Sequence, residues 1–336
     1  MNIDKKGKRI NTIQVIRAIA CIMVIICHSS YTDWGQTGVD FFLIISGFVI
    51  MYSTEKSGTD SFWLKRIKRI IPLYWSVTIF TSFLIIIAPS LFNSYEVSGV
   101  YFIKSLLFIP YYHNGLAGPI VAIGWTLNYE MLFYLIFWLN LKINKKYRGY
   151  GTVFSIILLV LIGKIFTLPT IIDYWCNPVL LEFAYGIIIY YVMTVIEKSN
   201  WKEKVANYKL SISVFSYVLI IIAIELAEYF YQNIKVSRAY YVAGIISIVV
   251  LFYVIFDKQI WCPKWILKIG DHSYEIYLLH IFCVRLCEKV LHRIGVTGLG
   301  VMIADIIFSI FCIMCGVEVK NRILQYYRHR KEYIYE

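Results

Sequence analysis

Residues 12–31 read TIQVIRAIACIMVIICHSSY, and this stretch decides the fold. A transmembrane helix needs about 20 predominantly apolar residues, and the stretch meets that requirement with two ionisable side chains inside it, Arg17 and His28. The whole chain is 59% hydrophobic and 16% charged, whereas soluble proteins are about 45–50% apolar and about 25% charged. A soluble core could not bury this excess, so the composition excludes a soluble enzyme, a disordered protein and a fibrous repeat.

The same apolar pattern recurs along the chain and predicts an all-α polytopic membrane protein with about ten transmembrane helices. We expect these helices at residues 12–31, 37–55, 71–89, 124–142, 151–168, 176–196, 210–230, 239–256, 272–291 and 298–318. The stretch 100–110 is apolar but too short to cross a bilayer, and Pro110 closes it. We therefore expect a short half-helix there, or a segment lying at the membrane surface.

The distribution of basic residues predicts which side of the membrane each segment faces. With the N-terminus inside, the inner segments hold 25 of the 33 Lys and Arg residues and the outer segments hold four. Basic residues are enriched on the cytoplasmic side, so we expect both termini in the cytoplasm. The orientation in the membrane and contact with membrane lipids then explain the net charge of +12. We therefore expect no nucleic-acid partner. Residues 1–320 form the expected membrane domain, and residues 321–336 form a basic cytoplasmic tail.

Ionisable side chains inside predicted spans are the first candidates for a functional site, because charge in hydrocarbon is costly. Arg17 and His28 are eleven residues apart, which places them on one helix face about 16 Å apart along the axis. Further polar groups fall in the outer half of the predicted bundle: Asp40, Glu130, Glu182, His280 and Asp305. The alternative is that these groups pair with one another to hold helices together.

A second cluster precedes the third predicted span, on the cytoplasmic side. Arg66 and Arg69 are one helical turn apart, and a pair of guanidinium groups suits phosphate oxygens. The alternative is a patch that binds lipid headgroups and sets topology. Both clusters fit coenzyme A, whose phosphate-rich head would rest on Arg66 and Arg69 while its arm extends past Arg17 towards His28.

Five ordered motifs resemble the bacterial membrane acyltransferase-3 family of O-acyltransferases. Their sequences are most similar to those of the exopolysaccharide-type O-acetyltransferases. The motifs are Arg17 with His28, GVDFFLIISGFVI at 38–50, RIKRIIPLYW at 66–75, WTLNYEMLFY at 125–134 and SYEIYLLH at 273–280. One position departs from the pattern, because Thr126 stands where the family more often has Ser. The resemblance implies a bacterial inner-membrane enzyme that moves an acetyl group from cytoplasmic acetyl-CoA to a sugar hydroxyl on the far side.

The mechanism we expect uses His28 as the catalytic group. It either activates the acceptor hydroxyl as a general base or carries the acetyl group itself, with Glu130 and Asp40 orienting or charge-balancing the imidazole. Arg17, Arg66 and Arg69 would bind acetyl-CoA, which is a co-substrate, and no metal is expected. Substrate contact or oxyanion stabilisation is expected from Trp125, Asn128, Tyr129 and Ser46. Gly47 indicates close approach of a helix or a ligand.

Other functions fit parts of the pattern. A polysaccharide or lipid-linked sugar transporter or flippase would also need a polar lining, and a non-catalytic scaffold in glycan assembly is a third reading. The predicted partner is an extracytoplasmic glycan, with a homo-oligomer and glycan-assembly partners left open. The sequence identifies neither the glycan nor the hydroxyl group that is modified.

Overall fold

A computed structural model describes residues 9–55, 61–89, 97–113, 116–198, 208–234 and 237–335. The chain divides into two compact units. The first consists of Met1–Ile13 with Val39–Cys262, and the second of Gln14–Gly38 with Pro263–Glu336. Each unit is described by itself.

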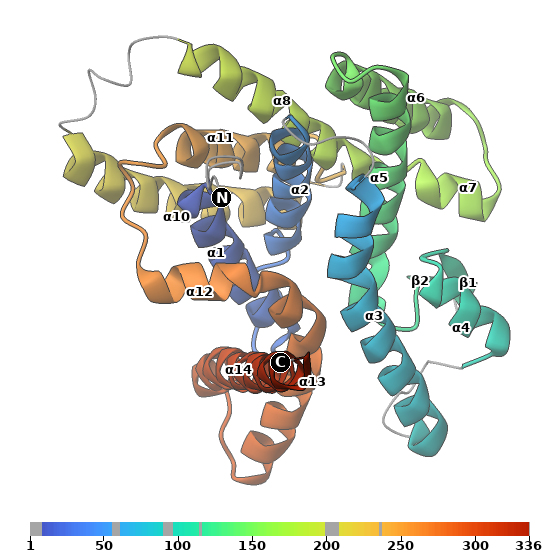
Figure 1. The fold of residues 1–336 in the computed structure, drawn as a ribbon, viewed down its shortest axis with the longest axis vertical. Coiled ribbons are helices and arrows are strands. Elements are labelled where there is room, and N and C mark those ends of the chain that lie inside the picture. Colours follow the sequence, from blue (N-terminus) through green and yellow to red (C-terminus); the bar gives the residue numbers. More distant parts are fainter. Residues whose placement is uncertain are drawn as a thin grey trace. The chain divides into compact units, whose positions relative to one another are not determined.

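The first unit is a set of packed helices with one small hairpin (Figure 1). Its elements are α2 (Gly38–Thr54), α3 (Phe62–Ile87), α4 (Gly99–Leu106), β1 (Tyr111–His113), β2 (Leu116–Gly118), η3 (Ala122–Gly124), α5 (Trp125–Ile143), α6 (Arg148–Ile165), α7 (Thr170–Trp175), α8 (Leu180–Glu197), α10 (Lys209–Asn233) and α11 (Val242–Ile255). Packing runs from α5 to α6, α8, α11 and α10 in that order, and α3 packs on α4.

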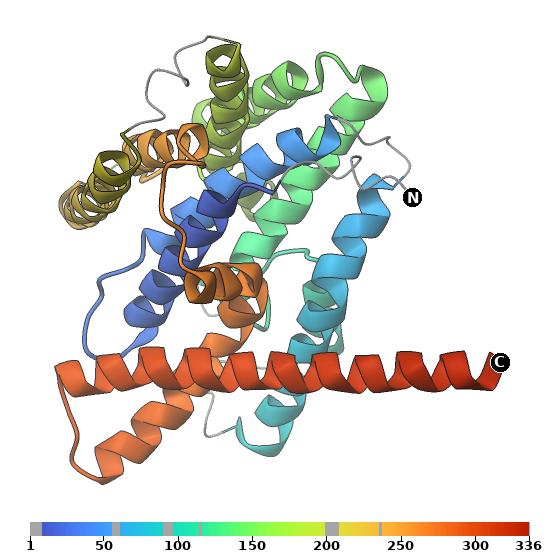
Figure 2. The same cartoon turned by 60° about the vertical axis from the view of Figure 1, so that its left-hand side comes forward.

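The second unit holds most of α1 (Asn11–His28) together with α12 (Lys264–Asp271), α13 (Ser273–Arg293) and α14 (Leu299–Tyr335). Helices α13 and α14 pack against each other over much of their length. The Sγ atom of Cys21 lies 3.5 Å from the carbonyl oxygen of Ser273, which joins α1 to the start of α13. Figure 2 shows α14 as one unbroken helix.

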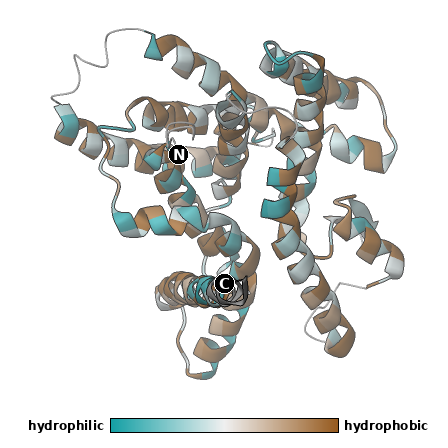
Figure 3. Ribbon diagram, in the orientation of Figure 1, coloured by the Kyte–Doolittle hydropathy of each residue, from teal (hydrophilic) through white to brown (hydrophobic). Residues whose placement is uncertain are grey.

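Long apolar helices confirm that this is a helical membrane protein. Within the described residues, six helical stretches are long and apolar enough to cross a bilayer: Asn11–His28, Phe62–Ile87, Arg148–Ile165, Thr170–Glu197, Lys209–Asn233 and Leu299–Tyr326. Helices α2 and α11 are apolar but shorter. Large apolar side chains such as Phe154 of α6 and Phe311 of α14 are exposed. Most of the helices are rich in hydrophobic residues, which are brown in Figure 3.

Each of the ten predicted spans contains a helix, but ten crossings and cytoplasmic termini stay predictions. The basic residues used for the orientation include several outside the described residues, namely Lys5, Lys6, Lys8, Lys56, Lys202, Lys204 and Lys235. A short helix, α4, lies within the stretch where a half-helix or a surface segment is predicted.

Three local features differ from the sequence prediction. The hairpin of β1 and β2, paired from Tyr111 with Gly118 to His113 with Leu116, was not predicted. Helix α3 begins at Phe62, so the basic segment is the first part of the same helix as the span. The predicted basic tail likewise continues helix α14 as far as Tyr335.

Close packing of α2 on α8 explains the glycine within the second predicted span. A Cβ atom on Gly47 would lie 2.1 Å from the carbonyl oxygen of Phe183, and one on Gly186 would lie 2.0 Å from that of Ile44. The two glycines therefore let the backbones of α2 and α8 touch, as small residues do at membrane helix interfaces.

We expect Gly186→Ala to lower the thermal unfolding midpoint of the purified protein, because the added methyl group meets backbone that cannot move aside. Overpacking of this kind costs about 1–3 kcal/mol. Gly244→Ala on α11 is the matched control, since a Cβ atom there meets nothing within 4 Å and Ala favours helix more than Gly. Equal midpoints for the two variants would contradict the close packing.

Candidate active site

His28 ends α1 and faces His280 of α13 within the second unit. The two rings meet edge to face, with centroids 4.8 Å apart. His280 is fully buried, whereas His28 is half-buried. Nε2 of His280 lies 3.3 Å from Nδ1 of His28.

The hydrogen bonds fix a consistent tautomer for both rings. Nδ1 of His28 lies 2.8 Å from the carbonyl oxygen of Val24, and Nδ1 of His280 lies 2.8 Å from that of Tyr277. Because carbonyl oxygens only accept, each neutral ring carries its proton on Nδ1. Nε2 of His280 can then only accept, and it shares the single Nδ1 proton of His28 with the Val24 carbonyl. In the described part of the chain no hydrogen bond engages Nε2 of His28, so this lone pair is available to take a proton.

Hydrogen bonds hold the segment after α1 against α13 and α14. Ser29 donates to Asp305 of α14 at 2.8 Å, and the backbone amide of Ser30 donates to Glu288 of α13. Glu288 also pairs with Arg285 at 3.2 Å. Asp305, predicted as part of a polar lining, thus has a structural partner that helps to fix the segment directly after His28.

Arg17 is half-buried on α1, within electrostatic range of Cys21 one turn further along the helix. Its assigned contact with acetyl-CoA stays a prediction.

Within the first unit, Asp40 and Glu182 share one cation. Both carboxyl groups are fully buried, and Nε of Arg238 lies 3.3 Å from Asp40 and 4.0 Å from Glu182. Helices α2 and α8 supply the acids, and the segment before α11 supplies Arg238. Asp40 therefore has a partner in its own unit, and its predicted role beside His28 stays a prediction.

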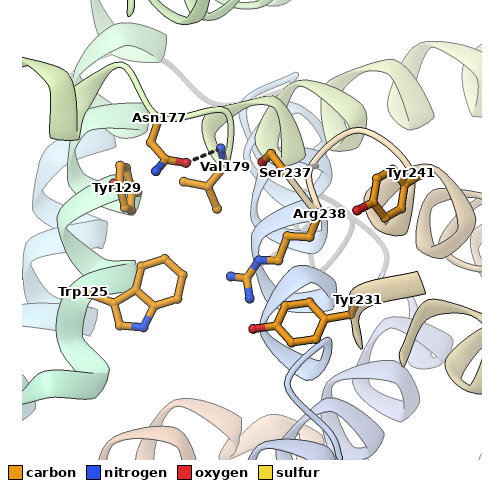
Figure 4. Close-up of a pocket in the computed structure, with 8 residues that line it drawn as sticks. All are labelled: Trp125, Tyr129, Asn177, Val179, Tyr231, Ser237, Arg238 and Tyr241. Atoms are coloured by element: carbon orange, nitrogen blue, oxygen red, sulfur yellow. Dashed lines mark hydrogen bonds between the residues drawn. The ribbon is translucent and has the colours of Figure 1, made fainter. Parts of the chain in front are cut away.

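The guanidinium of Arg238 faces a cavity of about 410 Å³ (Figure 4). Trp125 and Tyr129 of α5 line one side, and Tyr231 of α10 and Tyr241 line the other. The guanidinium carbon lies 5.4 Å from the ring centroid of Trp125 and 6.0 Å from that of Tyr231. Two of the predicted substrate-contacting residues, Trp125 and Tyr129, are thus brought to one cavity.

Behind this cavity, an aromatic stack fixes the start of α5. The rings of Tyr129 and Tyr174 are parallel at 4.7 Å, and the Tyr129 hydroxyl donates to the Tyr174 carbonyl at 2.9 Å. Asn128 is fully buried beside the Tyr174 hydroxyl. Asn128 is not among the residues that line the cavity, and its predicted contact with substrate stays a prediction.

Glu130 accepts hydrogen bonds from two hydroxyl groups. Ser46 of α2 donates at 3.0 Å, and Tyr134, one turn further along α5, donates to the same oxygen. The structure therefore joins two predicted site residues, Ser46 and Glu130, to each other. Whether Glu130 also orients His28 stays a prediction.

The two predicted phosphate-binding arginines lie on the first turns of α3. Arg66 is half-buried, with its guanidinium carbon 4.6 Å above the Phe62 ring and one nitrogen 3.0 Å from Ser53. Arg69 is exposed one turn further on. Both arginines lie within electrostatic range of Tyr134, and Arg66 also lies within electrostatic range of Glu130. The arginine pair is therefore near the cluster of Tyr134, Glu130 and Ser46.

Sequence reasoning missed three partners in these clusters. His280 was expected in the polar lining but not against His28, and Arg238 was counted only as an outer basic residue. Tyr134 lies one turn after Glu130, and that spacing could have identified it. The other two partners come from distant segments, which spacing along the chain does not reveal.

Charged and polar side chains buried among apolar helices mark a functional site in a membrane-embedded protein. The acyltransferase-3 family model, described as an acyltransferase domain, matches residues 10–317. The chain belongs to this family and is an acyltransferase.

Similar proteins agree with the family. The chain is 27% identical over 290 residues to the exopolysaccharide production protein ExoZ of Rhizobium meliloti (strain 1021), covering 81% of this chain and 84% of that protein. It is 23% identical over 313 residues to SACOL0978 of Staphylococcus aureus (strain COL), provisionally named an O-acetyltransferase, covering 82% of this chain and 51% of that protein. The chain thus spans about half the length of this staphylococcal relative. No solved structure gives a significant match.

We expect Arg238→Gln to destabilise the protein much more than Glu182→Gln does. Removing the cation leaves two buried carboxyl groups unpaired, and breaking a buried pair costs about 3–5 kcal/mol. Glu182→Gln keeps the shape of the side chain and leaves one acid for one cation. Thermal unfolding in detergent compares them, and equal losses would contradict the shared ion pair.

Proposed function

We propose that this acyltransferase moves an acetyl group from cytoplasmic acetyl-CoA to a sugar hydroxyl of an exported or cell-surface polysaccharide, or of its lipid-linked precursor. The name of ExoZ refers to exopolysaccharide production, and SACOL0978 is provisionally named an O-acetyltransferase. These names support a glycan acceptor and an acetyl donor for this chain. We place the enzyme in the inner membrane of a bacterium.

The observation that carries the proposal is the arrangement of His28. Its Nδ1 proton is held by the Val24 carbonyl and faces Nε2 of His280, which leaves Nε2 of His28 as the basic atom. A base held in one tautomer by a second group is the usual way to activate a hydroxyl nucleophile.

In the proposed reaction, Nε2 of His28 takes the proton of the acceptor hydroxyl while the hydroxyl oxygen attacks the thioester carbonyl carbon. The carbon–sulfur bond then breaks, and the proton on His28 passes to the departing thiolate. An acetyl-histidine intermediate is the other route, in which Nε2 attacks the thioester carbonyl carbon and the carbon–sulfur bond breaks to release the thiolate. The sugar hydroxyl oxygen then attacks the acetyl carbon, the bond to Nε2 breaks, and the hydroxyl proton passes to the thiolate. His280 stabilises the imidazole orientation in both routes.

On the donor side, Arg66 and Arg69 supply two guanidinium groups for the phosphates of acetyl-CoA. The hydrogen bond to Ser53 and the Phe62 ring hold Arg66 in place, so little side-chain freedom is lost when a phosphate binds. Arg17 on α1 is proposed to contact the extended arm of the donor.

We expect His28→Ala to reduce acetyl transfer by about 10²–10⁴-fold, the usual contribution of a general base.

His280→Phe keeps a buried ring but removes the acceptor facing Nδ1. A hydrogen bond contributes about 1 kcal/mol, so we expect kcat to fall several-fold to about tenfold with the KM for acetyl-CoA unchanged. The assay follows labelled acetyl from acetyl-CoA into polysaccharide in membranes.

His292→Ala is the matched control, because His292 is exposed at the end of α13, and it should retain activity. Wild-type turnover in His28→Ala would rule out both routes. A wild-type protein that moves lipid-linked sugar across membranes and leaves no acetyl group on it would point to a flippase instead.

We expect Arg66→Ala and Arg69→Ala each to raise the KM for acetyl-CoA by about tenfold or more, because hydrogen bonds to charged groups contribute about 1.5–3 kcal/mol. Lys65→Ala and Lys68→Ala remove the same charge from exposed positions on the same helix. If all four variants weaken donor binding equally, the segment is a general basic patch and the specific role of the arginines is excluded.

A further inference from the structure

The cavity beside Arg238 has the composition of a carbohydrate site. Aromatic rings of Trp125, Tyr129 and Tyr231 line it, together with the polar side chains of Asn177, Ser237 and Arg238 (Figure 4). Binding sites for small molecules combine apolar, often aromatic walls with a few placed polar groups, and typically enclose about 300–1,000 Å³. A volume of about 410 Å³ leaves room for a sugar unit packed against an aromatic face.

The polar groups of the cavity are positioned by contacts behind them. Asn177 accepts a hydrogen bond from the backbone amide of Val179 at 2.9 Å, which commits its oxygen and leaves its amide nitrogen as a donor (Figure 4). Arg238 is held by Asp40 and Glu182 on one side and lies between the rings of Trp125 and Tyr231. Fixed donors of this kind recognise hydroxyl groups without a large cost in side-chain ordering.

The charges of the cluster formed by Arg238, Asp40 and Glu182 indicate which sugars the cavity fits. Arg238 is the one charged side chain among the described residues that line the cavity, and two buried carboxyl groups accompany it. The three groups together carry a net charge of zero if one acid is protonated and minus one if both are ionised. The two carboxyl groups therefore offset the charge of Arg238, and the cluster carries no net positive charge in either state.

We propose that this cavity binds a neutral pyranose unit of the acceptor glycan, stacked on Trp125 and hydrogen-bonded by Asn177 and Arg238. The inference rests on the proposed function, because it assigns the acceptor site of that reaction. It also gives Asp40 and Glu182 a role as positioning residues, which hold Arg238 at the cavity wall. Trp125 and Arg238 belong to segments whose predicted side is extracytoplasmic, where an exported glycan would lie.

The experiment measures binding of methyl glycosides of glucose, galactose and mannose to the full chain by saturation-transfer difference NMR. Lipid nanodiscs without glycoside detergent are required, because such detergents carry competing sugars. Methyl glucuronide is the anionic probe. The same preparations are assayed for acetyl transfer to polysaccharide, with separate KM values for acceptor and acetyl-CoA.

Two variants and one control test the site. Trp125→Phe keeps a smaller ring, and Asn177→Asp keeps the acceptor for the Val179 amide while removing the amide donor. Trp261→Ala is the control, since Trp261 is exposed and away from the cavity lining. We expect binding of a neutral glycoside to weaken about three- to tenfold in each variant, and the acceptor KM to rise by a similar factor. The KM for acetyl-CoA and the behaviour of Trp261→Ala should match the wild type.

The outcomes separate this inference from the proposed function. Acetyl transfer by the wild type with unchanged acceptor KM in both variants would overturn the acceptor site and leave the proposed function standing. Tighter binding of the glucuronide than of every neutral glycoside would also overturn it. Failure of the wild type to acetylate any glycan would remove the proposed function, and this inference with it.

Discussion

The constraint on which this structure depends is that charged and polar side chains inside apolar helices must find partners in the protein. Asp40 and Glu182 are fully buried and meet on Arg238, while Glu130 receives the hydroxyl groups of Ser46 and Tyr134. Each cluster joins helices that are distant in sequence, so the polar groups fix how the helices pack. The same need for partners orients the imidazole of His28 through a backbone carbonyl and His280.

In our proposal, each unit supplies different groups for acyl transfer. The second unit holds the imidazole and ties the end of α1 through Ser29 and Asp305. The first unit holds the arginine pair, the cluster of Ser46, Glu130 and Tyr134, and the aromatic cavity at Trp125. In our proposal the donor, the base and the acceptor each use a different cluster, in which Arg66, His28 and Arg238 are held by contacts within the protein before substrate binds. Preorganisation of this kind reduces the entropy lost on the way to the transition state.

Much of the fold could be predicted from the sequence, because the length of its apolar stretches and the distribution of its charged residues directly indicate a membrane protein. Every predicted span contains a helix, the half-helix near residue 100 is α4, and the glycine at position 47 marks a close helix contact. Family membership, read from five motifs, is confirmed. The pairing of Arg238 with Asp40 and of His280 with His28 could not be predicted, because both depend on tertiary packing and not on spacing. The hairpin at residues 111–118 escaped prediction because its strands are only three residues long.

The central claim is that an imidazole reached by the donor from one side of the membrane serves an acceptor on the other side. Proteoliposomes test this directly, with the chain sorted into one orientation, acetyl-CoA sealed on the side of Arg66 and Arg69, and a membrane-impermeant polysaccharide on the opposite side. The account predicts that labelled acetyl reaches the polysaccharide in this arrangement and that transfer stops when acetyl-CoA is present only on the side of the polysaccharide. Equal transfer with both substrates on one side would contradict it.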